Sequence, residues 1–147
     1  MTDRGVSTVL GYVLSLAIMT ILITGLLATG SSLVADQTEK VVRSELRVIG
    51  NQIAADLTTV DRLALSGDEV NVRLTRDLPA SVAGTSYRIN VSRPGGDGPV
   101  EIRLTSNDPE VDVTVTVNNE TAVAERTVSG GKIVVRYDGD AVVIDRA

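Results

Sequence analysis

The spacing of apolar residues changes twice along the chain. Between Arg4 and Asp36 no residue is charged. From residue 36 to about residue 65, apolar residues recur every three or four positions, which predicts an amphipathic helix. After Gly67 the period falls to two, which is typical of half-buried β-strands. The pattern predicts three parts: an apolar helix, its amphipathic continuation and a β-rich remainder.

The uncharged segment is long enough to cross a membrane. Residues 6–35 would form a helix of about 45 Å, which exceeds the hydrocarbon core of about 30 Å. A discarded secretory signal has a shorter apolar stretch of about 7–15 residues, so we disfavour that interpretation. A retained anchor is favoured. Arg4 and the amino terminus would stay in the cytoplasm, with the chain beyond residue 36 outside.

Small residues recur within this helix at intervals of four. Ser7, Gly11 and Ser15 share one face, and Gly25 and Thr29 repeat the spacing. Such residues let helix backbones approach closely in lipid, which favours a helix-packing surface. The alternative is that Gly, Ser and Thr are ordinary components of a membrane helix.

The amphipathic segment continues the same helix. No proline interrupts the chain before Ser66-Gly67, so we predict one helix over residues 6–65. Polar residues, Asp56 among them, are expected on its other faces. The apolar stripe, which we expect to pack on the strands, consists of Val42, Leu46, Ile49, Ile53, Leu57 and Val60.

The remainder predicts about seven strands. Alternation and turn motifs place them near residues 70–75, 87–92, 100–105, 111–117, 121–128, 132–137 and 141–146. Residues 129–132 and 138–140 are predicted to close tight hairpins. The expected fold class is α+β, with the long helix packed on a small antiparallel β-sheet domain. The alternative is a helix followed by an immunoglobulin-like β-sandwich.

Composition restricts the chemistry. The 147 residues include no His and no Cys, which excludes Ser-His-Asp and Cys-His sites and thiolate or histidine zinc sites. We therefore expect no enzyme, catalytic residue, metal or cofactor. The 14 basic and 19 acidic residues argue against nucleic-acid binding. Twelve of the bases are Arg and twelve of the acids are Asp, which hints at a surface adapted to high salt.

Three further motifs are candidates for calcium, phosphate or N-glycosylation sites. Clustered carboxylates in residues 106–112 and 138–140 could attract Ca²⁺, but they lack the spacing of a calcium loop and are interpreted as turns. The glycine-rich stretch at 94–98 lacks the lysine of a phosphate loop. Asn90 and Asn119 begin N-glycosylation acceptor triplets, and both are expected to be reachable from outside.

The amino terminus resembles a known family. In "DRGVSTVLGYVLSLAI" a short polar leader with a basic residue is followed by a small residue and then directly by the apolar helix. This arrangement is similar to the type III signal peptide of the type IV pilin superfamily. The residues of this stretch also resemble those of haloarchaeal type IV pilins. The resemblance implies cleavage by a prepilin peptidase between Gly5 and Val6, with Arg4 marking the cytoplasmic boundary. Many pilins carry Glu five residues into the mature chain, where this sequence has Leu10.

The resulting hypothesis is a type IV pilin-like structural subunit. Its parts would be a cleaved leader (1–5), a membrane and filament-core helix (6–35), an amphipathic helix (36–66) and an extracytoplasmic β domain (67–147). Expected partners are membrane lipid, the prepilin peptidase, other pilin subunits and the assembly machinery. The alternative is a single-pass anchored protein whose β domain binds a partner without forming a filament.

Overall fold

The computed structural model describes the backbone of residues 2–67 and 71–147, and the side chains of residues 5–30, 33–67 and 71–147. The beginning of the strand expected at Val70 lies outside these residues. The chain divides into two compact units, Met1–Gln37 and Thr38–Ala147. A single helix, α1 (Thr2–Ala64), supplies the first unit and the beginning of the second.

The helix ends where the sequence predicts. The amide of Leu65 donates to the Asp61 carbonyl, and both the amide and the hydroxyl of Ser66 donate to the Leu63 carbonyl. These bonds tighten the last turn and satisfy carbonyls that lose their helical partners at a C-terminus.

Nine strands follow in the described part of the second unit. They are β1 (Arg73–Asp77), β2 (Ser81–Val82), β3 (Thr85–Ser92), β4 (Val100–Asn107), β5 (Glu110–Val117), β6 (Ala122–Val123), β7 (Arg126–Ser129), β8 (Lys132–Tyr137) and β9 (Ala141–Arg146). One sheet has the order β1-β8-β9-β6, and the other has the order β2-β3-β4-β5 with β7 also paired to β3. Every pair is antiparallel except β6 with β9.

The segment predicted as one strand over residues 121–128 is two strands in different sheets. β6 pairs with β9, whereas β7 pairs with β3. The predicted hairpin at 129–132 is therefore wrong, because β7 and β8 do not pair and the turn carries the chain from one sheet to the other. Gly131 permits this path with φ +116°, a value that favours glycine. The hairpin at 138–140 does join β8 and β9.

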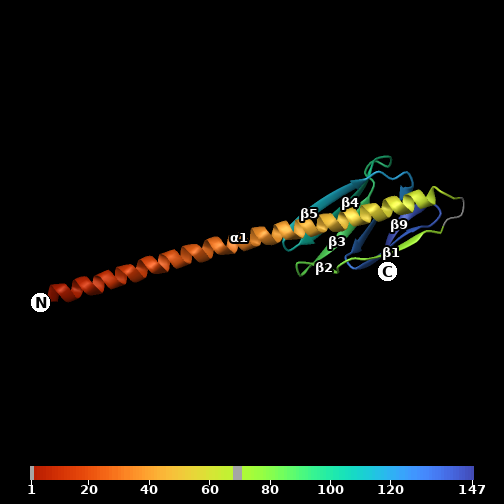
Figure 1. The fold of residues 1–147 in the computed structure, drawn as a ribbon. Coiled ribbons are helices and arrows are strands. Elements are labelled where there is room, and N and C mark those ends of the chain that lie inside the picture. The colour runs from red at the N-terminus through yellow and green to blue at the C-terminus, as the bar shows by residue number, and fades with distance from the viewer. Residues whose placement is uncertain (1, 68–70) are drawn as a thin grey trace. The chain divides into compact units, whose positions relative to one another are not determined.

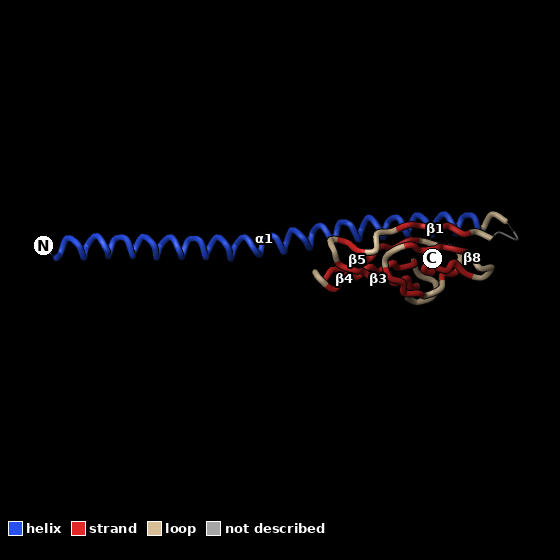
Figure 2. The backbone as a smooth tube through the Cα atoms, turned by 90° about the horizontal axis from the view of Figure 1, so that it is seen from below, coloured by secondary structure: helices blue, strands red, loops and turns tan. Residues whose placement is uncertain are grey.

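The second half of α1 packs on the strands in one shared core. Figure 1 shows this part of the helix lying along the sheets, and Figure 2 shows the strands on one side of it. Apolar side chains from α1 and from both sheets form a single buried cluster. The α+β prediction is confirmed, and because the helix completes the core, an immunoglobulin-like sandwich does not describe the fold.

Gly50 allows α1 to approach the sheet closely. A Cβ at this position would lie 2.8 Å from Val115 Cγ2 and 2.9 Å from Leu104 Cδ1. Gly50→Leu should lower the free energy of unfolding by about 1–3 kcal/mol, because the extra atoms have no space. Urea unfolding of the full-length chain in detergent measures this loss. Asn51→Leu, on the exposed side of the same turn, should change stability by no more than about 0.5 kcal/mol; equal effects would contradict the packing.

The buried residue Tyr87 connects β3 by hydrogen bonds to the loop at Pro79 and to the turn at Gly130. Its side chain is 2% exposed, its hydroxyl donates to the Pro79 carbonyl at 2.7 Å, and its carbonyl accepts the Gly130 amide at 3.1 Å. Gly130 must lack a side chain, because a Cβ there would lie 2.6 Å from the ring. Burial raises the pKa of Tyr87 to about 12 from its ordinary value of 10.0.

The raised pKa of Tyr87 predicts a loss of stability in strong alkali. The unfolded chain releases this proton near pH 10 and the folded chain only near pH 12, so the contribution is complete below pH 10 and declines above it. The decline should reach about 2 kcal/mol by pH 12. Unfolding of wild type and Tyr87→Phe across pH 9–12 tests this. Identical slopes would show that Tyr87 is not the responsible group.

Candidate anchoring and assembly surfaces

The first unit exposes an apolar surface on every side. Of the twenty large apolar residues that are exposed in the described chain, sixteen lie between Val6 and Val34. Leu26 is 73% exposed and Tyr12 is 72% exposed. The helix is long and apolar enough to cross a membrane. A surface of this kind in water would be strongly unfavourable, so it requires lipid or protein around it.

Three threonine hydroxyls in this segment donate hydrogen bonds within the helix. Thr20 Oγ1 donates to the Leu16 carbonyl at 2.8 Å, Thr24 Oγ1 to the Thr20 carbonyl at 2.8 Å and Thr29 Oγ1 to the Gly25 carbonyl at 2.9 Å. Because hydrocarbon offers no hydrogen-bond partners, these internal bonds make the threonines compatible with a bilayer.

The predicted small-residue positions share one helix face. At about 100° per residue, Ser7, Gly11, Ser15, Gly25 and Thr29 fall within about 80° of arc. All five are exposed in the described structure. A Cβ built on Gly11 or Gly25 would meet no atom within 4 Å. The chain itself therefore leaves this face open, and the glycines are not needed for packing within one copy.

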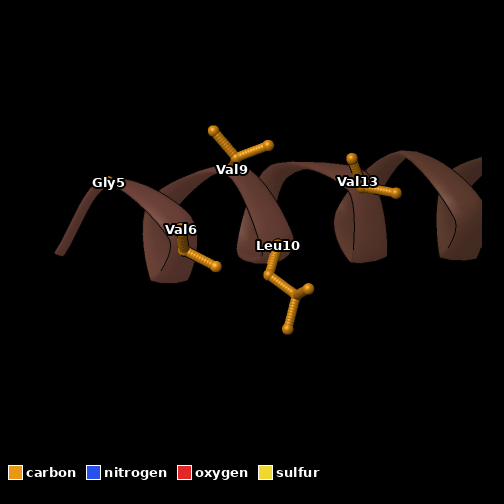
Figure 3. Close-up of a pocket in the computed structure, with 5 residues that line it drawn as sticks. All are labelled: Gly5, Val6, Val9, Leu10 and Val13. Carbon is orange, nitrogen blue, oxygen red and sulfur yellow. The ribbon is translucent and has the colours of Figure 1, made fainter. Parts of the chain in front are cut away.

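The predicted processing junction lies within the first turns of α1. Gly5 has no atom near its absent side chain and Val6 is 62% exposed, while the Arg4 side chain lies outside the described part of the structure. A shallow hollow between successive turns is lined by Gly5, Val6, Val9, Leu10 and Val13. In Figure 3 Val9 and Val13 point to one side of the helix and Leu10 to the other. All five of these lining residues belong to α1.

A match to a protein family covers nearly the whole chain. The family described as a family of unknown function (DUF7266) matches residues 1–145. The chain belongs to the DUF7266 family. No curated protein and no solved structure matches it. Because the match spans α1 and all the strands, the apolar helix and the β domain are parts of one family unit in this DUF7266 protein.

The amphipathic part of α1 joins the β domain of the DUF7266 chain through its apolar stripe. Ile49 is 4% exposed and the other five positions are fully buried. The stripe positions are Val42, Leu46, Ile49, Ile53, Leu57 and Val60. All six belong to the core that contains residues of both sheets. This contact makes the last part of α1 a structural element of the domain.

The burial of two aspartates on α1, Asp56 and Asp61, was not predicted from the sequence. Asp56 was expected on an outer face, but it is 3% exposed and pairs with Arg76 of β1, whose Nε donates to Asp56 Oδ2 at 2.8 Å and whose Nη2 donates to Oδ1. The hydrogen bond to Asp56 and its negative charge raise the pKa of Arg76. Asp56 is buried because, at 100° per residue, it lies beside the apolar stripe, where a basic strand residue can reach it.

Asp61 fixes the loop between β5 and β6. Its side chain accepts the Thr121 amide at 2.8 Å and the Glu120 amide at 3.2 Å. Arg93, which directly follows β3, holds the same loop, since its Nη2 donates to the Asn119 carbonyl at 2.8 Å and the Thr121 carbonyl at 3.1 Å. No local pattern in the sequence indicates this cluster, because the partners of Asp61 are backbone groups far from it along the chain.

The two glycosylation triplets differ in accessibility. Asn90 is exposed on the central strand β3, although its amide donates to Thr127 Oγ1 at 2.8 Å. Asn119 is half-buried, its amide donates to the Thr121 carbonyl at 3.1 Å, and its Oδ1 is buried without a partner among the described residues. Asn119 is therefore less accessible than Asn90 in the folded domain.

The acidic side chain of Asp138 accepts hydrogen bonds from the backbone of its own turn. Asp138 Oδ1 accepts the Ala141 amide at 2.9 Å and the Asp140 amide at 3.2 Å. These backbone hydrogen bonds lower the pKa of Asp138. Within the described ranges no group of three or more acidic side chains converges as a metal site would require.

Proposed function

We propose that this DUF7266 protein is a type IV pilin-like structural subunit, held in the cytoplasmic membrane and then assembled into a surface filament through its N-terminal helix. The observation that carries the proposal is the exposed apolar unit: sixteen large apolar side chains between Val6 and Val34 have no cover within the chain. A bilayer covers them before assembly, and copies of the same helix cover them afterwards.

The proposed maturation step is cleavage by a prepilin peptidase after Gly5. Gly5 places no side chain beside the scissile bond, Arg4 marks the cytoplasmic side and Val6 becomes the new amino terminus. Cleavage removes the polar leader, including both of its charged residues, and leaves a helix whose first thirty residues are uncharged. The mature helix is then free of side-chain charge where it must leave the bilayer and enter a filament.

The β domain faces outward in this proposal and performs no catalysis. Its partners are lipid, other subunits and the assembly machinery. The high proportion of Arg and Asp suits a cell surface in high salt. Asn90 is the better candidate of the two for N-glycosylation, because Asn119 is engaged in the loop that Asp61 holds.

Shearing of intact cells tests the function. Cells that express the full-length chain with a C-terminal tag should release it as sedimentable filaments, and the remaining chain should stay in the membrane pellet after carbonate washing. Chain that remains entirely in the membrane and is never recovered in sheared filaments would favour the anchored binding protein instead.

A further inference from the structure

The side of α1 that faces away from the β domain carries a basic surface without acidic residues. At about 100° per residue, these positions lie opposite the apolar stripe. We call this surface the outer face, and all of its residues are exposed: Lys40, Val41, Arg47, Val48, Ala55 and Arg62. Val41 is 40% and Val48 is 54% exposed, so the surface combines positive charge with apolar side chains.

The bases of the outer face are not neutralised by their own chain. Arg43, an exposed base of the same helix segment, forms an ion pair with Glu39 at 2.8 Å, but this pair lies on a neighbouring side of the helix. In the described residues no ion pair reaches Lys40, Arg47 or Arg62. A partner for this surface should therefore supply negative charge.

Opposite charge is concentrated in the β domain. Residues 65–147 carry thirteen acidic and nine basic residues. Asp108 lies in the turn between β4 and β5, Glu110 is the first residue of β5, and both are exposed. Within the described chain neither of these carboxylates has an ion-pair partner. The Thr85 hydroxyl donates to the Asp108 carbonyl and so holds the backbone of this turn.

We propose that the outer face of one copy binds the acidic β4–β5 turn of a second copy. This inference rests on the proposed filament function. Two outer faces could not pair with each other, because that arrangement places bases against bases. An interface between two different surfaces of identical chains does not close on itself and propagates along a filament. It would also cover Val41 and Val48.

Lipid headgroups fit the outer face less well. Lys40 and Arg62 are separated by about 33 Å along the helix, at 1.5 Å per residue. The headgroup region on one side of a bilayer is only about 5–8 Å deep. A helix that leaves the membrane near residue 36 could place Lys40 in that layer, but not Arg47 and Arg62 as well.

Charge reversal with rescue tests the proposal in cells that produce only the variant. Lys40→Glu with Arg47→Glu should reduce the amount of chain recovered in sheared filaments at least about tenfold. Adding Asp108→Lys and Glu110→Lys should restore it to within about twofold. Arg73→Glu with Arg88→Glu changes the net charge equally at exposed positions of the β domain, and should leave recovery unchanged.

The possible outcomes distinguish a failure of the proposed interface from a failure of the proposed function. Normal recovery of the Lys40/Arg47 variant overturns the interface, and so does a loss that the acidic-turn reversal does not restore. A loss of membrane retention instead of filament recovery would assign the outer face to lipid and also overturn it. If the wild-type chain yields no filaments, the proposed function itself fails.

Disulfide trapping gives an independent measurement because the chain has no cysteine. Ser44 lies next to Lys40 and Arg47 on the same side of α1, Asn107 lies beside the acidic turn, and both are exposed. Ser44→Cys with Asn107→Cys should give a ladder of cross-linked copies in sheared filaments under oxidation, which either single variant cannot form. Pairing Ser44→Cys with Ser129→Cys is the control. Intact filaments without the expected ladder, or with an equal ladder in the control, would refute the contact.

Discussion

Gly11→Leu should abolish incorporation of the chain into filaments while leaving its insertion into the membrane intact. Gly11 lies at the centre of the face formed by Ser7, Gly11, Ser15, Gly25 and Thr29, and among the described residues no atom beyond the adjoining helix backbone lies within 4 Å of its Cβ position. The leucine is therefore tolerated by a single copy. It separates two helix backbones only where a second copy packs against this face.

The experiment compares the sheared fraction with the membrane fraction for each variant. Ala17→Leu is the matched control, because it enlarges an exposed small residue about 120° away from Gly11 on the same helix. It should assemble normally. Normal filament incorporation of Gly11→Leu would show that the small-residue face meets lipid only.

Ile53→Ala should lower the free energy of unfolding of the β domain by about 2–5 kcal/mol. Ile53 is 0% exposed and lies in the middle of the apolar stripe, so truncation leaves a cavity between α1 and the sheets. Since a domain has only about 5–15 kcal/mol of total stability, this loss should also reduce the amount of folded protein. Pulse proteolysis of the full-length chain in urea and detergent measures it.

Val48→Ala provides the control for this substitution. Val48 is 54% exposed on the same helix, so its truncation should change stability by no more than about 0.5 kcal/mol. A similar loss for both variants would mean that the apolar stripe does not anchor the helix to the sheets.

The parts of the fold that depend on local periodicity were predictable. The apolar stripe at positions 42, 46, 49, 53, 57 and 60 follows the helical repeat, and the alternation in β5 follows the pleat of a strand. The helix end near Ser66 was predictable for the same reason, since its signal is carried by adjacent residues.

The parts that depend on long-range pairing were not predictable. Residues 121–128 have one continuous strand pattern, but Ala122 pairs with Ala141 and Thr127 pairs with Asn90 in another sheet. The buried position of Asp56 depends on Arg76, twenty residues away, and that of Asp61 on amides sixty residues away. The spacing of residues in the sequence does not indicate such contacts, because they form only when the sheets assemble on the helix.

The predictions about candidate sites also divide into those that depend on local spacing and those that depend on long-range contacts. The apolar length and the small-residue face of residues 6–35 follow from local spacing. The outer face could also have been identified from the helical repeat, since its bases recur opposite the apolar stripe. The partial burial of Asn119 could not, because its loop is held by hydrogen bonds to Asp61 and Arg93, which are distant in the sequence.

The identity of the first residue of the mature chain tests the central claim most directly. The chain should be purified from the membrane and from sheared filaments of cells that contain their prepilin peptidase, and its amino terminus determined by sequencing or mass spectrometry. The account predicts Val6 as the first residue in both fractions. An amino terminus at Met1 or Thr2 would contradict the processed, pilin-like subunit.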